Sequence, residues 1–547
     1  MKRYFFIPLT VLLSVVLSAQ VHITIDDPAT WTAQALAPYV GQEVIFDSPL
    51  TISSNSSSSS LVISPTRLFT ANNQALPGSV ENSNVVIHNS ACSMTLYDMP
   101  SRSNDAPYRC GEKIYDLRVK VNSTKSLSWR DWRCVGNTRA ELEQGIPDLG
   151  DYRLLICAMN LEYYLVANAG YPGPSSYSQH QYQRTKVGKA LALINADAYG
   201  LVEVELGSEA LKEIADDLNN KIPGRSFTQV MDYTKATGTN TKSGFVYDAN
   251  KLRPVGALQR VTEGPANRKM MQCFEEIATG ERFIFSINHF KAKTSGGVGP
   301  DADHGQGNYN ATRTAEARGV YTMYEAVSYA MNEPDILIMG DLNAYAKEDP
   351  IMVFLNHEMI DLHRAFHADS SYSYQFSGLA GYLDHAISNK TLYLQVTGMC
   401  GFHINSDEND RYTYDKSSDN TMFRSSDHDP VLVGLKLDST LSREINPYIY
   451  NANYSDSLVF QNMYDLNNPD KKSYFAIYTI DGLPICPVTE IKYTDEMMQQ
   501  KDKTYTIAAD NPNLPKEIKQ YLPLPPGLYI IHIYFRNTVM RYKVMVR

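Results

Sequence analysis

The segment DILIMGDLNAYAKEDP occupies residues 335–350 and decides the fold of the central part of the chain. It begins with an almost unbroken apolar run, which is typical of a strand that is buried on both faces of a sheet. The run ends at Asp341 and Asn343, so an acid and an amide directly follow a buried strand. A short turn there would aim both side chains at one point, where they could orient a water molecule or a phosphate. The alternative is that Asp341 only caps the helix that follows.

Other apolar runs between residues 151 and 437 also end at polar residues. They are LLICAM (154–159) before Asn160, the run 199–202 before Glu203, and RFIFSIN (282–288) before His289. Helical patterns lie between these runs, at 184–196 and at about 313–330. Strands that alternate with helices predict a layered α/β domain. Such domains gather their functional side chains where the strands end.

Two further motifs pair a carboxylate with an imidazole. SSDHDPV (425–431) places Asp427 beside His428, and GYLDHAIS (381–388) carries Asp384. A carboxylate such as Asp384 can fix the tautomer of a histidine and stabilise its protonated form. Asn160 and Glu203 offer hard oxygen ligands, which suit Mg²⁺ or Ca²⁺ better than zinc. Taken singly, each of these residues has a simpler interpretation as a turn residue, a solvated strand end or a structural histidine.

Together these elements resemble the endonuclease/exonuclease/phosphatase superfamily, to which deoxyribonuclease I belongs. The resemblance covers 151–437 and rests on MNLEYYL, GLVEVE, INHFKAK, GDLNAY, YLDHAIS and SSDHDPV, which follow one another in the family's order. It implies a four-layer αββα sandwich. The segments NRKMMQCFEE (267–276), DADHGQGNYNATR (301–313), SYSYQFSGLAGYLDHAIS (371–388) and HINSDEND (403–410) are similar to the bacterial extracellular nuclease branch. Two points depart from or complicate the pattern: Val202 stands where the family has glutamine, and we align Asn160, rather than Glu162, with the family's asparagine.

The resemblance implies a role for each matching residue. The divalent metal would be held by Asn160 and Glu203 with help from Asp427, with Mg²⁺ as the expected ion and Ca²⁺ or Mn²⁺ as alternatives. The implied catalytic residues are His289, Asp341, Asn343, Asp384 and His428. Among them, Asp341 and Asn343 resemble the pair that orients the attacking water and the phosphate. The implied reaction is in-line attack of water on a phosphodiester.

Both histidines resemble catalytic imidazoles. His428, held by Asp384, resembles a general base or a stabiliser of the transition state, and His289 resembles the group that donates to a phosphate oxygen or to the leaving oxygen. The sequence leaves open which is the acid and which the base. We expect substrate contacts from Lys291, Asn310 and Arg313, although the two cations could equally be surface charges.

The flanking regions read as β-rich. Residues 20–150 hold short runs such as GQEVIF (41–46) and KIYDLRVKV (113–121), and a Ser/Asn-rich stretch at 53–60 predicts a loop. This region weakly resembles an OB-like module, a fold that can bind single strands; an all-β spacer is the alternative. Residues 438–547 resemble the C-terminal sorting domains of type IX secretion, which are small β-sandwiches, and an ordinary accessory β-sandwich is the alternative.

The N-terminus has the pattern of a secretory signal over residues 1–19. Lys2 and Arg3 precede an apolar stretch that is short for a membrane span, and small residues follow it. We therefore expect a protein that is secreted or held at the outer cell surface, without membrane insertion, and whose C-terminal domain contacts the secretion machinery. The chain has 7 cysteines, an odd number, so at least one stays outside any intramolecular disulfide.

The charge of the chain limits the classes of function. A formal net charge of −10 argues against a protein that coats nucleic acid through its own charge. It does not argue against an enzyme that meets phosphates through a bound cation. The leading hypothesis is a secreted, divalent-metal-dependent nuclease, an endonuclease acting on DNA, with RNA as an alternative substrate. The other hypotheses are a phospholipid phosphodiesterase of the sphingomyelinase type and a non-catalytic surface binding protein.

Overall fold

The computed structural model describes residues 20–57, 59–166, 173–232, 241–265 and 267–438, together with 6 strands after residue 457. The predicted signal segment, 1–19, lies outside the described residues. Within the described ranges, no helix is both long and apolar enough to cross a membrane.

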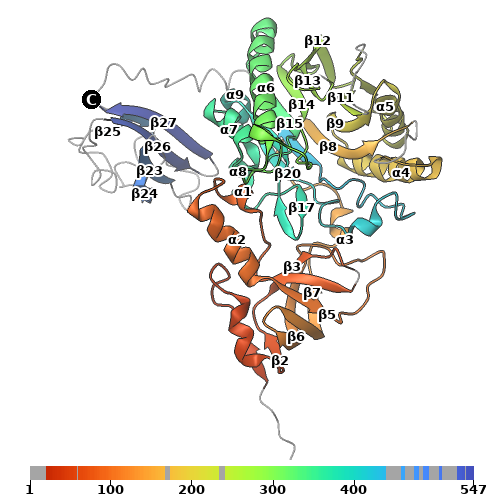
Figure 1. Ribbon diagram of the computed structural model, residues 1–547. Coiled ribbons are helices and arrows are strands. Elements are labelled where there is room, and N and C mark those ends of the chain that lie inside the picture. Colours follow the sequence, from red (N-terminus) through yellow and green to blue (C-terminus); the bar gives the residue numbers. More distant parts are fainter. Residues whose placement is uncertain are drawn as a thin grey trace, which may run out of the picture.

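Two six-stranded sheets form the centre of the segment 151–437 (Figure 1). The first sheet has the order β10 (Phe227–Gln229), β11 (Thr241–Asp248), β9 (Ala198–Glu205), β8 (Leu154–Tyr164), β21 (Val431–Leu435) and β20 (Val396–Gly401). The second has the order β12 (Leu252–Arg260), β13 (Lys269–Glu276), β14 (Arg282–His289), β15 (Ile336–Asp341), β19 (Asp384–Ser388) and β16 (Ile360–Asp361). Neighbours β8 and β9 run parallel, as do β14 and β15.

Alternate residues of the apolar strands enter different layers. In β15, Leu337 and Met339 join the cluster between the two sheets, whereas Ile336 and Ile338 join the cluster beneath the outer helices. The same alternation separates Ile156 of β8, which faces the other sheet, from its neighbours. A strand that is buried on both faces needs a continuous apolar run, because successive side chains point to opposite sides. This explains why the runs at 154–159 and 335–340 show no polar alternation.

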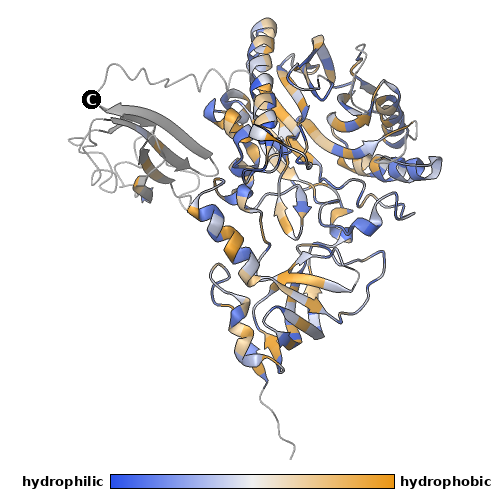
Figure 2. Cartoon of the chain, in the orientation of Figure 1, coloured by the Kyte–Doolittle hydropathy of each residue, from blue (hydrophilic) through white to orange (hydrophobic). Residues whose placement is uncertain are grey.

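Helices cover the outer face of each sheet. In the first sheet they are α4 (Tyr177–Ile194) and α5 (Glu209–Lys221), and in the second they are α6 (Asn310–Met331) and α7 (Asp349–Asn356). The sheet strands carry most of the hydrophobic colour in Figure 2, and the outer helices mix hydrophobic and hydrophilic residues. The predicted four-layer αββα sandwich is confirmed. Shorter elements border it: η2 (Gly299–Asp301), α8 (Leu362–His367), α9 (Lys390–Tyr393), η3 (Asp410–Tyr412) and a hairpin of β17 (Tyr374–Phe376) and β18 (Leu379–Gly381).

The region before the sandwich contains a small β-barrel. Its strands follow the order β1 (Val21–Ile23), β2 (Glu43–Phe46), β6 (Lys113–Ser123), β3 (Leu50–Ser54), β4 (Ser60–Ser64), β5 (Met94–Tyr97) and β7 (Ser126–Val135). Because β7 also pairs with β6, the five strands β3, β4, β5, β7 and β6 close into a ring. A five-stranded barrel of this kind agrees with the OB-like expectation. The remaining elements are η1 (Ala33–Tyr39), α1 (Ala71–Gln74), α2 (Val80–Cys92) and α3 (Arg139–Leu142).

The described residues after 457 are all strands. They form a four-stranded antiparallel sheet of β24 (Pro484–Ile491), β23 (Ser473–Thr479), β26 (Gly527–Phe535) and β27 (Thr538–Val546), and a pair of β22 (Leu458–Gln461) with β25 (Thr504–Ile507). Their β character agrees with the expectation for 438–547. In the described range 20–438, none of the cysteines forms a disulfide.

Candidate active site

Strand register brings several predicted residues to one edge of the sandwich. In the second sheet, Asp341 at the end of β15 pairs with His289 of β14 on one side and with Asp384 of β19 on the other. In the first sheet, Asn160 and Glu203 lie toward the ends of the parallel neighbours β8 and β9. Nδ2 of Asn160 donates a hydrogen bond to Oδ2 of Asp341 over 3.2 Å, so the two sheets meet at this point.

The backbone is irregular where it presents the metal-ligand candidates. Glu203 has a φ of +60°, in the left-handed region, and the pairing of β8 with β9 is interrupted between Asn160 and Tyr164. Within this irregular stretch, the backbone N–H of Tyr163 donates to Oε2 of Glu203 over 3.1 Å. Left-handed non-glycine residues cost free energy and often mark functional sites. The contact also supplies an orientation for Glu203 that does not depend on the residue at position 202.

Asn343 and His289, both buried, join Asn160 around Asp341. Its Oδ1 accepts the backbone N–H of Asn343 over 2.8 Å, and its Oδ2 accepts Nδ2 of Asn343 over 3.1 Å. Nε2 of His289 lies 3.7 Å from the same Oδ2 and 3.5 Å from Oε1 of Glu203. Asn343 itself has a φ of +48° and donates to the carbonyl of Phe290. The acid–amide pair predicted from its spacing therefore does converge on one point.

Negative charge accumulates at this edge. Burial, followed by the carboxylates of Asp427 and Asp341, raises the pKa of Glu203 to about 7. Burial likewise raises the pKa of Asp341 to about 7, with Asp384 adding to the effect and His428 opposing it. Asp427 is the more open carboxylate, since 32% of its side chain is exposed. A set of oxygen ligands that repel one another when ionised is suited to a hard divalent cation. Glu203 and Asp427 thus fit the implied metal. Asn160 directs its Nδ2 to Asp341 and Glu203, and its Oδ1 accepts the backbone N–H of Glu162, so its amide must turn over to serve as a ligand.

His428 is held by Asp384. Its Nδ1 lies 2.7 Å from Oδ2 of Asp384, and Ser373 donates to that same oxygen over 2.7 Å. The ring of Tyr374 covers the imidazole, with the two ring centres 4.6 Å apart. Burial lowers the pKa of His428, but the carboxylates of Asp384, Asp427 and Asp341 outweigh it and raise that pKa well above its ordinary value. Asp384 and His428 therefore form the predicted pair.

The two histidines have opposite electrostatic surroundings. Burial is the main cause that holds the pKa of His289 well below its ordinary value, and the positive charges of Arg268 and His428 act in the same direction. In the absence of a cation, these surroundings favour a neutral His289 and a protonated His428. A bound cation would lower the pKa of both rings, because it adds positive charge nearby.

A further group of candidate ligands emerges from the packing. Asp341, Asp384 and His428 are all buried and offer ligand atoms within 4.8 Å of one another. Two of these residues, Asp384 and His428, already bond to each other, which favours an acid–base pair over a ligand set.

The structure adds residues that the sequence reasoning did not assign. Glu162 has a buried Oε2 without a hydrogen-bond partner, and burial, together with Asp427, raises its pKa to about 8. The sequence could have indicated Glu162 only through its position two residues after Asn160. Ser373 and Tyr374 also belong to the site through Asp384 and His428, but only the quoted motif at 371–388 pointed toward them.

The three predicted substrate contacts fall in different places. Arg313 is fully buried, and its guanidinium donates to the carbonyls of Lys291, Asn308 and Gln306. It supports the loop before α6, so a direct substrate contact does not fit this geometry. Lys291 is partly exposed, with its Nζ 4.5 Å from the centre of the Tyr309 ring, and remains a candidate contact.

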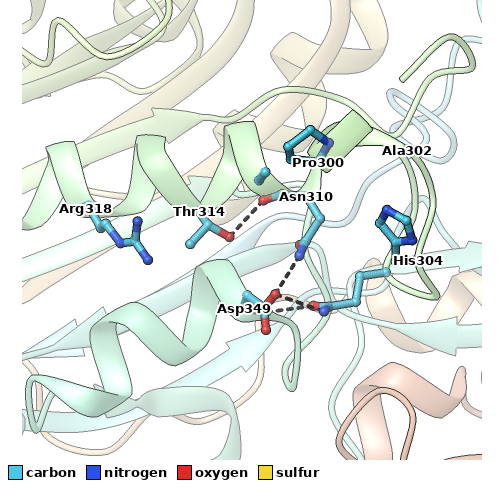
Figure 3. A pocket seen from close by; sticks show the side chains of 9 residues that line it. Pro300, Ala302, His304, Asn310, Thr314, Arg318 and Asp349 are labelled. Atoms are coloured by element: carbon cyan, nitrogen blue, oxygen red, sulfur yellow. Dashed lines mark hydrogen bonds between the residues drawn. The ribbon is translucent and has the colours of Figure 1, made fainter. Parts of the chain in front are cut away.

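Asn310 lies beside a surface hollow of about 330 Å³ at the start of α6 (Figure 3). Its Nδ2 donates to Oδ2 of Asp349 over 2.7 Å, and Gln306 donates to the same oxygen. In the described residues its side chain is thus bonded to α7 rather than to the catalytic carboxylates. A substrate contact by Asn310 stays a prediction that this geometry does not favour.

About half of the chain is similar in fold to solved endonuclease/exonuclease/phosphatase structures. A protein of that description from Bacteroides vulgatus matches with 15% identity and a TM-score of 0.36, over 52% of this chain and 99% of its own. A mannosyl-6-phosphatase from Bacteroides thetaiotaomicron matches with 16% identity and a TM-score of 0.36, over 52% and 100%. A D. rerio TDP2 complexed with single-strand DNA product matches with 12% identity and a TM-score of 0.34, over 52% and 99%.

The similarity is one of fold alone. No family model and no curated protein matches the chain.

Proposed function

We propose that this protein hydrolyses phosphodiester bonds and requires a divalent metal held by Asn160, Glu203 and Asp427. The observation that carries the proposal is the hydrogen-bonded convergence of both sheets: Asn160 on Asp341, and the Asp384–His428 pair beside it. A non-catalytic binding protein would have no need of two buried imidazoles beside a set of buried carboxylates that repel one another.

The residues divide the work of the reaction. A divalent cation held by Asn160, Glu203 and Asp427 would supply charge that offsets the negative phosphate. Asp341 and Asn343, which are joined by two hydrogen bonds, hold the attacking water and a phosphate oxygen in place. His428, kept in one tautomer by Asp384, moves a proton at its Nε2. His289 donates a hydrogen bond or a proton to a phosphate oxygen or to the leaving oxygen.

We propose nucleic acid as the substrate, with DNA before RNA. Support comes from the resemblance of segments 301–313 and 371–388 to extracellular nucleases. The second segment carries Ser373, Tyr374 and Asp384, which contact one another or His428. A sugar phosphate and a phospholipid are the substrates to exclude, since the mannosyl-6-phosphatase shares the fold and the sphingomyelinase type remains an alternative. Endonuclease action is part of the same proposal.

The deciding experiment incubates the purified full-length protein with circular plasmid DNA, RNA, sphingomyelin and mannose 6-phosphate. Each substrate is tested with Mg²⁺, Ca²⁺, Mn²⁺ and EDTA. We expect nicking of the plasmid that EDTA abolishes and Mg²⁺ restores. Cleavage of lipid or sugar phosphate alone would overturn the nucleic-acid proposal, and the absence of cleavage on every substrate would overturn the enzymatic one.

We further propose that the protein is exported and that residues 438–547 act as a secretion sorting domain. The support is the pattern of residues 1–19 and the β-rich character of the last segment. Mass spectrometry of the protein recovered from culture medium tests both: loss of the first 19 residues supports export, and an intact C-terminus contradicts removal of the sorting domain.

A further inference from the structure

The loop 403–409, called here the bridging loop, lies between the N-terminal barrel region and the candidate catalytic residues. On its catalytic side, Nδ2 of Asn405 donates to the carbonyl of His428 over 2.7 Å, and its Oδ1 accepts the backbone N–H of Ser425 over 2.9 Å. The carboxylate of Asp429 accepts the backbone N–H groups of Asn405 and Ser406. The segment 425–429 that carries Asp427 and His428 is thus fastened to the bridging loop at both ends.

The other side of the bridging loop is held by residues from the N-terminal region. Arg67 makes two hydrogen bonds with Asp407, of 2.7 and 3.2 Å, and Asn137 donates to the same carboxylate over 2.7 Å. The backbone carbonyl of Asp407 accepts from Cys110 N–H and from Nδ2 of Asn55, each over 3.0 Å.

Two more arginines meet at Glu408. Arg139 contacts it through Nε and Nη2, at 3.0 and 2.8 Å, and Nε of Arg109 lies 2.7 Å from it. All three side chains are at most 4% exposed. Buried ion pairs contribute little to stability compared with apolar packing, because desolvation offsets the attraction, but their geometry is strict. A network of this kind suits a part of the molecule whose orientation matters.

The hairpin β17–β18 also contacts the N-terminal region (Figure 1). Nε2 of Gln375 donates to the carbonyl of Ser53 in β3, and Ala380 exchanges backbone hydrogen bonds of 2.8 Å with Leu68 and Thr70. Tyr374, next to Gln375, covers the ring of His428. Both segments that enclose His428 are therefore attached to the N-terminal region.

We propose that the N-terminal region completes the catalytic site by fixing the bridging loop, so that Arg67, Arg109 and Arg139 are positioning residues for His428. This inference rests on the proposed function for its kinetic readout, and on the structure alone for the second readout below. It also gives the N-terminal barrel a role other than that of a separate substrate-binding module.

Arg139→Met is the most direct test in the full-length protein. The substitution keeps the unbranched stem of the side chain and removes the guanidinium. It leaves Glu408 paired with Arg109, and Asp419 with Lys186, so no buried carboxylate is stranded. Arg225→Met is the matched control: it removes an arginine that also bridges two carboxylates, Asp197 and Asp248, near the start of β9 and away from Glu203. Asp197 keeps Lys251 as a partner at 3.0 Å, and Asp248 keeps the backbone N–H groups of Ser226 and Asn250.

We expect Arg139→Met to lower kcat by roughly 10-fold or more with KM changed by less than about twofold, since a misplaced catalytic group affects the reacting step. Arg139→Lys should recover most of that loss, and Arg225→Met should leave kcat unchanged. Hydrogen exchange followed by mass spectrometry should show faster exchange in 425–430 for Arg139→Met and no change in β9.

An unchanged kcat in a folded Arg139→Met protein, or an equal loss in Arg225→Met, would overturn the inference. If the unmodified protein cleaves no substrate, the proposed function fails and hydrogen exchange alone decides. Faster exchange in 425–430 then supports the positioning role, and unchanged exchange removes it.

Discussion

His428 and Asp384 lie on different elements, yet Nδ1 of the histidine is 2.7 Å from the carboxylate of the aspartate. Asp384 starts β19 in the second sheet, and His428 precedes β21 in the first. The pair therefore ties the two sheets together at the same edge as the contact between Asn160 and Asp341. This bond leaves Nε2 of His428 as the nitrogen available for chemistry.

Asp384→Asn should lower kcat by about 10²-fold or more, because an amide preserves the contact but favours the wrong tautomer and does not stabilise a protonated ring. His428→Ala should cost at least as much. Steady-state cleavage of a chromogenic phosphodiester gives both values. Since the two residues act as a unit, the double variant should be no slower than His428→Ala alone. Losses that add in full would contradict a functional pair.

Glu203→Gln should shift the Mg²⁺ dependence of activity. The amide keeps one oxygen ligand but loses the charge. The Mg²⁺ concentration that gives half-maximal activity should therefore rise roughly 10-fold or more. Titration of activity against Mg²⁺ measures the change. Glu209→Gln, at an exposed residue that begins α5, is the control and should match the original protein. An unchanged Mg²⁺ requirement in a folded Glu203→Gln protein would remove Glu203 from the ligand set.

Lys291 and Arg313 should respond differently to substitution. Lys291→Ala should raise KM for DNA and weaken its dependence on salt, because a partly exposed cation that meets phosphate adds to the salt sensitivity. Arg313→Lys should instead lower the melting temperature, since the guanidinium bonds to three backbone carbonyls in the loop before α6. KM measured at two salt concentrations, with thermal unfolding, separates the two effects. A stable Arg313→Lys protein with a raised KM would restore Arg313 as a substrate contact.

The fold of the central segment was predictable because each of its buried strands is marked by a continuous apolar run in the sequence. The apolar run at 282–288 ends at His289 in the structure as in the sequence pattern, and the run 335–340 ends at Asp341. The end of each run therefore fixes the position of the site residue that follows it. The register of the strands then brings these residues together, since Asp341 pairs directly with His289 and Asp384.

What the sequence could not reveal depends on contacts between distant segments. The ion pair of Arg139 with Glu408 joins residues 269 positions apart, and no local pattern marks either partner. Arg313 has the residue type and helix-start position of a phosphate contact, and only its burial shows otherwise. The left-handed φ of Glu203 is likewise invisible in a strand that reads as regular.

The acidic cluster predicts how the stability of the metal-free protein depends on pH. Folded Glu203 and Asp341 have pKa values of about 7, against ordinary values of 4.5 and 3.8. Between about pH 4 and 7 the folded protein therefore binds more protons than the unfolded chain, so its stability falls as pH rises. His428 acts in the same direction: its raised pKa stabilises the fold at low pH, and that contribution is lost as the ring deprotonates. His289, whose pKa is lowered, opposes the two acids below about pH 6.5.

Thermal unfolding in EDTA should consequently show a melting temperature that declines from pH 5 to pH 8 by more than about 2 °C. Mg²⁺ binds the ionised carboxylates, so its addition should flatten or reverse the decline, with the largest stabilisation above pH 7. Glu203→Gln removes one of these acids and should reduce the slope in EDTA, whereas Glu209→Gln should not. A melting temperature that rises with pH in EDTA, or a Mg²⁺ effect that is largest at pH 5, would mean that these carboxylates do not share a cation site.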